Sequence, residues 1–528
     1  MIALPRRWRT PLIAAPAAFL IVFYVWPVGT LLARVLRSAD AFDVLGSPGL
    51  VRVLWFTLWQ AVASTAATVL VGFGPAYLLA RYRFPGRRAV YTLVTIPFML
   101  PTVVVGGAFL AILPTSWYDS TKALLLAHVF FNVAVVVRLL GTMWAVIPRS
   151  LTGAAQLLGA SPAQVLRHVV LPLLRPALLA ATTVVFLFTF TSFGAATLLA
   201  GPAHPTVEVE IARRATQLGD IDGAAALAVA QLLFLTIVIV VLTALQRRNV
   251  VQIRGRAPAA APRSRRQRRW VAGSATVIAA TFAAPLVAIV VRSVRGRDGW
   301  SLTAWRTLGT AEVRPGITLG VDPAGSMLTS LRFAIVAAAV SIVIGTAAAL
   351  GIYAAQRWGR LLDGGIMLPL GTSSVTIGFG MLITFDQAPL DWRSQWWLIP
   401  LGHALVASPF VVRTLLPALR SIPSGRVEAA TLLGASPSRA WITVIVRPMS
   451  RAIAAAGALA AVISLGEFGA TTFLTRSGRE TMPIAIGRLL RRAGDVPRGQ
   501  GFALATVLMV VTAAVVAASE HTLRSHEA

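Results

Sequence analysis

The chain contains twelve runs of predominantly apolar residues, and each run is long enough to cross a lipid bilayer as a helix. A helix needs about 20 such residues to span the hydrocarbon core. Backbone groups cannot remain unpaired in lipid, and these runs are too long and too evenly apolar for the strands of a membrane barrel. We therefore predict an all-α membrane protein with about 12 transmembrane helices, near residues 12–36, 54–80, 90–113, 122–147, 174–200, 223–245, 271–291, 327–355, 361–385, 396–419, 452–475 and 501–519.

The composition agrees with this class. Of the 528 residues 56% are hydrophobic and 13% charged, and the mean hydropathy is +0.75. The net charge of +29 could suggest nucleic acid as a partner, but basic residues that flank apolar spans are the usual topology signal of a membrane protein. We expect the lipid bilayer, and no nucleic acid, as partner. The sequence has no cysteine, which excludes disulfides, thiolate metal sites and cysteine nucleophiles.

Arginine in the short connections predicts the orientation. Residues 6–9, 81–88 and 246–269 are rich in arginine and fall on one side, which the positive-inside rule places in the cytoplasm. Both termini are then cytoplasmic, and we expect a multi-pass membrane protein. The N-terminal apolar run is too long for a signal peptide and fits a retained first span. One segment, residues 476–498, disagrees because it is rich in arginine and falls outside.

The two halves of the chain are duplicates. Gly159 matches Gly434, and His128 matches His403, at the same offset of 275 residues. The sequence therefore predicts two homologous six-helix halves in parallel orientation. We expect the first half at residues 1–245, a basic cytoplasmic linker at 246–270 and the second half at 271–528.

The clearest repeat is a stretch that occurs at residues 147–172 and again at 422–448. Both copies contain Leu-Leu-Gly-Ala-Ser-Pro, with the glycine at 159 and 434. A glycine suits the left-handed position after a helix, while serine and proline are favoured at the start of the next one. Gln164 completes a capping box in the first copy only. Each stretch should fold as helix, glycine turn and second helix, and we expect Pro172 and Pro448 to end that second helix.

The chain carries no recognisable catalytic chemistry. An ATP-binding loop of the GxxxxGK[ST] type needs a lysine, and the only lysine is Lys122, in a different context. The six histidines have no metal-ligand spacing, and there is no nucleophile elbow or carboxylate pair. We expect no catalytic residue, no metal site and no cofactor on this chain, and we expect the protein not to be an enzyme.

The repeated stretches resemble the coupling loop of the permease subunits of bacterial type I ABC importers, whose pattern is Glu-Ala-Ala, three residues, then glycine. The second copy has Glu428-Ala429-Ala430 and Gly434, whereas the first has Gly153-Ala154-Ala155 and Gly159 and so lacks the glutamate. The resemblance implies that each loop docks on a cytoplasmic ATPase subunit, with two copies per chain, that these partners bind ATP and magnesium, and that an extracytoplasmic protein delivers the substrate. The alternative is an interfacial helix without a partner.

A narrower resemblance concerns the substrate. Residues 126–132, residues 465–469 and the fused twelve-span layout look like the permeases of thiamine importers and, more loosely, of ferric-iron, sulfate and molybdate importers. The resemblance implies thiamine or a derivative, or ferric iron, as substrate. The competing class is a secondary transporter with two six-span halves driven by an ion gradient. Such a carrier would not require the duplicated loops and would more typically show several intramembrane carboxylates.

Within the apolar runs, Glu467 is the most expensive residue, since a charge at the centre of a span costs about 2.5–3.5 kcal/mol by insertion scales. Its counterpart in the first half is Ser192. Glu467 either faces a central pathway and helps a cation to pass, or bonds a neighbouring helix and braces a kink. We expect His128 and His403 to lie near helix ends, where they can reach the interface.

Small residues and prolines in the spans predict how the helices pack and bend. Gly72 and Gly345 are expected to let neighbouring helices approach closely. Pro97, Pro101 and Pro369 should kink the third and ninth spans.

Overall fold

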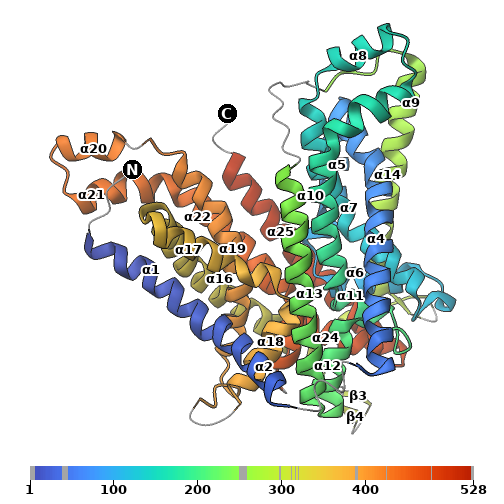
Figure 1. Cartoon of the computed structure of the whole chain (residues 1–528). Coiled ribbons are helices and arrows are strands. Elements are labelled where there is room, and N and C mark those ends of the chain that lie inside the picture. Colours follow the sequence, from blue (N-terminus) through green and yellow to red (C-terminus); the bar gives the residue numbers. More distant parts are fainter. Residues whose placement is uncertain are drawn as a thin grey trace. The chain divides into compact units, whose positions relative to one another are not determined.

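The computed structural model (Figure 1) describes residues 6–38, 46–248, 259–296, 299–310, 312–314, 317–318, 320–386, 390–423, 425–476 and 478–524. These residues are almost entirely helical. Two short antiparallel hairpins are the exception, with β1 (Arg295–Gly296) paired to β2 (Gly299–Trp300) and β3 (Glu312–Arg314) paired to β4 (Ile317–Thr318). The all-α prediction is therefore confirmed.

The first half of the sequence contains α-helices, three-residue or longer 3₁₀ turns and π-helical turns in the following order: α1 (Arg6–Leu20), η1 (Ile21–Val25), α2 (Trp26–Arg37), α4 (Pro48–Arg81), α5 (Arg87–Met99), α6 (Thr102–Ile112), η2 (Thr115–Trp117), α7 (Thr121–Val146), α8 (Arg149–Leu157), α9 (Pro162–Val165), η3 (Leu166–Val170), α10 (Leu171–Phe190), α11 (Gly194–Leu199), α12 (Val207–Arg213), η4 (Arg214–Leu218) and α13 (Ile221–Arg248).

The second half follows the same plan, with the hairpins inserted after its first span: α14 (Arg265–Ser293), α15 (Thr303–Arg306), α16 (Pro323–Ala354), α17 (Gln356–Met367), η5 (Leu368–Gly371), α18 (Ser374–Thr384), α19 (Leu398–Arg420), α20 (Gly425–Leu432), α21 (Pro437–Trp441), η6 (Ile442–Val446), α22 (Arg447–Gly466), α23 (Gly469–Leu474), α24 (Met482–Arg491) and α25 (Asp495–Arg524).

The number of spans agrees with the sequence. Among the described residues, 10 helices are long and apolar enough to cross a membrane, and two further pairs each make one bent span, which gives up to 12. The bent spans are α5 with α6, at 111°, and α17–η5 with α18, at 100°. Proline causes the first break, because Pro101 precedes α6 in an extended conformation and cannot continue α5. The predicted bends in the third and ninth spans are confirmed.

The predicted bounds of two spans are wrong at both ends. The fifth runs over Pro162–Phe190 and the eleventh over Arg439–Gly466, so each begins about a dozen residues earlier than expected and stops before the separate helices α11 and α23. The prolines Pro172 and Pro448 lie inside these spans and do not end them. In each case a π-helical turn, η3 or η6, ends two residues before the proline. The wider turn accommodates the missing amide and the bulk of the ring, so the helix continues.

The helices form two compact units, and neither unit is one continuous half of the sequence. The first comprises Met1–Gly46, Ile211–Leu232 and Ser293–Ala528, and the second comprises Ser47–Glu210 and Leu233–Arg292. The first span of each sequence half therefore belongs to the unit built mainly from the other half. Of the linker predicted at residues 246–270, positions 249–258 lie outside the described residues, as do residues 1–5 and 525–528 at the two termini.

In the second unit, α14 packs against α4 and α7. The Phe282 ring stacks on Phe130 of α7 at 5.4 Å, and Trp270 lies edge-on to Tyr82, just after α4, at 5.9 Å. At the other end of α14, Arg292 Nε donates to the Ala111 carbonyl oxygen at 3.0 Å. These contacts, at both ends and in the middle of the helix, attach α14 to this unit.

In the first unit, α1, η1 and α2 run beside α16, α17 and α18 (Figure 1). Tyr24 is buried and shares a hydrogen bond of 2.6 Å with the Thr372 hydroxyl group. The helices approach so closely that a Cβ atom at Gly351 would lie 2.8 Å from the Leu12 carbonyl oxygen. The close packing that glycine permits therefore fixes the first span on this unit.

A close helix contact at a glycine occurs at the matching place in both units. A Cβ atom at Gly72 of α4 would lie 2.7 Å from Cγ1 of Val136 on α7, and one at Gly345 of α16 would lie 2.6 Å from Cγ1 of Val411 on α19. The glycines predicted to allow close helix packing do so in both units. The duplication seen in the sequence thus extends to the packing of the central helix pair.

Several arginines of the segment at 476–498 bond to groups of their own unit. Arg488 pairs with the buried Glu480 at 3.1 Å, while Arg479 and Arg498 donate to the backbone carbonyl groups of Ser394 and Arg492. Arginines held in this way contribute to the local fold.

Candidate functional site

Both repeated stretches fold as predicted into a helix, a glycine turn and a second helix. The first copy consists of α8 and α9, and the second of α20 and α21. Gly159 and Gly434 adopt the left-handed conformation with φ of 87° and 85°. We refer to residues 147–172 and 422–448 as the first and second coupling loops.

The start of the second helix is capped in both loops. The Ser161 hydroxyl accepts from the Gln164 amide at 3.4 Å, and the Gln164 side chain accepts from the Ser161 amide at 2.7 Å, which completes the predicted capping box. In the second loop Ser436 accepts from the Arg439 amide at 3.4 Å. Arg439 cannot return the bond, since arginine has no acceptor.

The two alanines of each loop differ in their exposure to solvent. Ala155 and Ala430 are half-buried and pack on the hydrophobic clusters that contain Ile147 and Ile422, whereas Ala154 and Ala429 are exposed. The first alanine of each pair thus faces away from the chain, and the second attaches the loop to its own unit. This arrangement leaves a surface of small residues open on each loop.

Two highly exposed leucines follow each exposed alanine, three and four positions later in the sequence. Leu157 and Leu158 are 92% and 90% exposed, and Leu432 and Leu433 are both 88% exposed. Four leucines this exposed, in matching places, make each loop a candidate interaction surface. Sequence reasoning missed them as functional residues, although the repeated Leu-Leu before each turn glycine was a signal for them.

The loops are unequal in their first helix. Glu428 is exposed in the first turn of α20, where a negative charge stabilises the positive end of the helix dipole. Gly153 occupies the matching position in α8, which has no acidic residue in its first turn. Glycine within a helix costs about 1 kcal/mol relative to alanine.

Two arginines, Arg81 at the end of α4 and Arg149 at the start of α8, connect the first loop to α4. The buried Arg81 donates to the Ile147 carbonyl oxygen at 3.0 Å, and Arg149 donates to the Arg81 carbonyl oxygen at 2.8 Å. These two bonds join both sides of the turn before α8 to a membrane span.

Glu467 is buried at the start of α23. Its Oε1 accepts from the Ala470 amide at 2.9 Å, and the Ser374 hydroxyl donates to the same carboxylate. The side chain thus caps a short helix and connects it to the start of α18, which is the bracing contact considered from the sequence. The counterpart Ser192 is also buried, and its carbonyl oxygen accepts from Thr206 Oγ1 at 3.4 Å.

The two matched histidines are fully buried within their helices, so the expectation that they reach the interface is wrong. His403 bonds Ser464 Oγ through Nδ1 and Thr471 Oγ1 through Nε2, both at 2.8 Å. His128 bonds Ser64 Oγ through Nδ1 at 2.9 Å. A buried imidazole needs such partners, and hydroxyl groups of neighbouring segments satisfy both ring nitrogens of His403 but only Nδ1 of His128, whose Nε2 is buried without a partner.

Removing one of these partners should destabilise the first unit. Thr471→Val keeps the side-chain shape but leaves His403 Nε2 without its partner, which should lower the free energy of unfolding by about 1–3 kcal/mol. Thr472→Val is the matched control, because Thr472 Oγ1 bonds only the Phe468 carbonyl oxygen of its own segment. Thermal unfolding in detergent measures both. Equal melting temperatures for the two variants would contradict the interhelical role of this bond.

Two units with matching coupling loops on a set of apolar spans define a membrane permease with two fused domains. The model of the family described as "binding-protein-dependent transport system inner membrane component" matches residues 68–252 and again 341–521. The chain belongs to this family. It is a transport permease subunit of the ABC importer class.

Full-length relatives have the same fused layout. The chain is 26% identical to a probable ABC transporter permease protein of Sinorhizobium fredii over 92% of this chain and 90% of that protein. It is 28% identical to the thiamine transport system permease protein of Brucella suis biovar 1, over 94% and 93%. A shorter match, to the sulfate transport system permease protein of Salmonella typhimurium, is 30% identical over 41% of this chain and 83% of that protein.

Proposed function

We propose that this chain forms the translocation pathway of an ABC importer by alternating access, and that two separate cytoplasmic ATPase subunits drive it through the two coupling loops. The observation that carries the proposal is the pair of bare leucines on each loop. ATP and magnesium bind to the partners and not to this chain. In this account the loops and both termini lie in the cytoplasm and the spans cross the bacterial inner membrane, which agrees with the placement of arginine.

The leucines supply the docking energy. Fully burying one leucine side chain gains about 1.5–3 kcal/mol relative to exposing it. The two leucines and the exposed alanine of each loop therefore form a small apolar surface that inserts into a cleft of the ATPase. Because Ile147 and Ile422 fix the loops to the helix cores, closure of the ATPase pair moves the spans.

The proposed substrate is thiamine or a derivative, with ferric iron as the second candidate. Similarity to a thiamine permease along nearly the whole chain supports thiamine, while the match to a sulfate permease shows that the family alone does not select among substrates. We assign delivery of the substrate to an extracytoplasmic binding protein, as the family description indicates.

The test is uptake into proteoliposomes that contain the chain with its ATPase and binding protein. We expect accumulation of labelled thiamine only with internal ATP and magnesium, and no effect of collapsing the ion gradients. Uptake that follows an ion gradient without ATP would instead support the secondary carrier. Labelled ferric iron in parallel vesicles separates the two substrate candidates.

We also propose Glu467 and Ser192 as residues of the translocation pathway, and substitutions of Glu467 test this. Glu467→Gln keeps an acceptor for the Ala470 amide but removes the negative charge, whereas Glu467→Ala removes both. If the charge aids a cation, the glutamine variant should assemble normally and lose at least tenfold in uptake. Normal uptake by this variant, with poor assembly of the alanine variant, would leave Glu467 a helix cap alone.

A further inference from the structure

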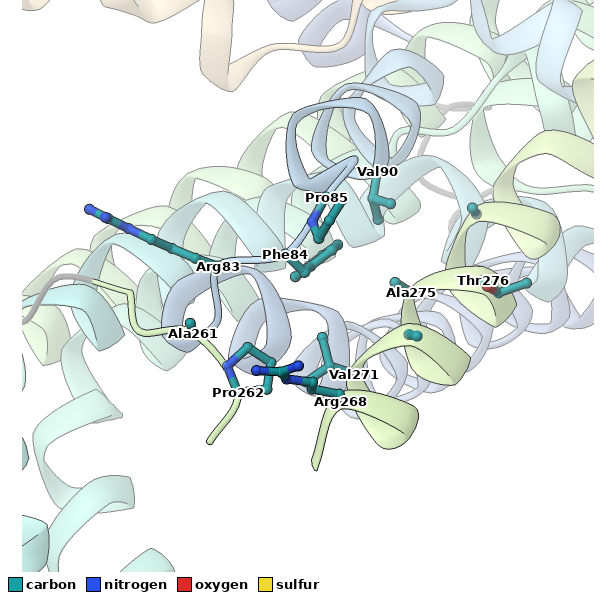
Figure 2. Close-up of a pocket in the computed structure, with 12 residues that line it drawn as sticks. Arg83, Phe84, Pro85, Val90, Ala261, Pro262, Arg268, Val271, Ala275 and Thr276 are labelled. Carbon is teal, nitrogen blue, oxygen red and sulfur yellow. The ribbon is translucent and has the colours of Figure 1, made fainter. Parts of the chain in front are cut away.

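A cavity of about 660 Å³ lies in the second unit, between the turn that follows α4 and the first turns of α14. Phe84, Pro85 and Val90 form one wall and Val271 and Ala275 the other (Figure 2). The lining is mostly apolar, and Arg83 and Arg268 contribute its basic groups.

Hydrogen bonds fix the relative positions of the two walls of this cavity. The end of the linker pairs with the turn, since the Arg83 amide donates to the Ala260 carbonyl oxygen at 2.9 Å and the Ala260 amide donates to that of Arg81 at 3.1 Å. Gln267 Nε2 donates to Tyr82 Oη at 3.0 Å and ties the first turn of α14 to the same place. The cavity is therefore built into the fold.

The position of the cavity suits a lipid headgroup. The cavity lies where the span α4 ends at Arg81 and the span α14 begins at Arg265. Part of the cavity is therefore at the level where the apolar helices give way to the basic loop. Arg83 and Arg268 are both exposed, and none of the residues that line the cavity is acidic. Basic pockets between spans at this level attract anionic headgroups.

We propose that this cavity binds one anionic phospholipid. The phosphate lies at Arg268, since the Arg83 side chain points away from both walls (Figure 2), and one acyl chain follows the apolar wall of Val271, Ala275 and Ala279 into the membrane. The lipid then joins α4, which the first coupling loop contacts through Arg81, to α14. A bound lipid at this place stabilises the second unit.

The test is native mass spectrometry of the detergent-purified full chain, titrated with dioleoylphosphatidylglycerol and with dioleoylphosphatidylcholine. We expect one tightly retained phosphatidylglycerol and a clear preference over phosphatidylcholine, which has the same chains. Arg268→Gln should weaken this binding by roughly fivefold. The matched control, Arg265→Gln, removes the same charge from an exposed position that does not line the cavity and should leave binding unchanged.

A second variant tests the acyl chain. Ala272 is exposed and lines the cavity, so Ala272→Phe should fill the groove without altering charge and should reduce phosphatidylglycerol binding severalfold. Unchanged binding by this variant, equal losses in the Arg268→Gln and Arg265→Gln variants, or displacement of the lipid by millimolar inorganic phosphate would each overturn the proposal. Size-exclusion profiles confirm that the variants remain folded.

Discussion

Replacing the two exposed leucines of either coupling loop with serine is expected to abolish ATP-driven uptake without unfolding the chain. The pairs are Leu157→Ser with Leu158→Ser, and Leu432→Ser with Leu433→Ser. Each leucine is at least 88% exposed, so it contributes little to the stability of the isolated chain. In the assembled importer each would lose about 1.5–3 kcal/mol of burial energy, which weakens ATPase binding by one to two orders of magnitude per residue.

The measurement is ATP-dependent uptake in vesicles together with the melting temperature of the purified chain. Leu302→Ser is the matched control, because Leu302 is also exposed, at 53%, but lies before α15 and away from both loops. We expect the control to transport normally. Undiminished uptake by either double variant would show that the leucines do not dock on the ATPase.

The second large effect is an inequality between the two loops: Gly434→Asp is expected to reduce ATPase coupling more than Gly159→Asp. The backbone strain is alike, since φ is 85° and 87° and any side chain there costs about 1–2 kcal/mol. The difference arises from the surroundings. The first loop keeps its capping box and its arginine anchors, whereas the second lacks the box and carries Glu428, the glutamate that the first loop has lost.

Stimulation of ATP hydrolysis by the loaded binding protein measures this coupling in each variant. Gly153→Ala is a suitable control, because a Cβ atom there meets nothing within 4 Å and alanine favours a helix. It should preserve or slightly raise coupling. Equal losses for the two aspartate variants would contradict the asymmetry.

The parts of the fold that local chemistry determines could be predicted from the sequence. Spans follow from the length of apolar runs, the break at Pro101 from the missing amide, and the turn at Gly159 from the only residue that accepts its φ without strain. The turn glycines of both coupling loops follow from the same local rules, whereas the alanine pairs were identified from the resemblance to the permease family, and their role stays a prediction.

The remaining features depend on tertiary contacts. An apolar run shows that a helix enters the membrane but not which neighbour it joins, so the exchange of the first spans between the units was not foreseen. The π-helical turns before Pro172 and Pro448 keep their helices intact, which a rule based on one residue does not capture. The bonds of His403 to hydroxyl groups on α22 and α23 join residues more than 60 positions apart.

The central claim is that energy enters this chain through its two coupling loops, and the most direct test is the stoichiometry of the purified complex. Affinity-tagged chain taken from its own membrane is expected to retain two ATPase subunits, and the variant with all four loop leucines replaced by serine is expected to retain none while remaining folded. A chain that transports its substrate yet never copurifies with an ATP-binding subunit would contradict the account.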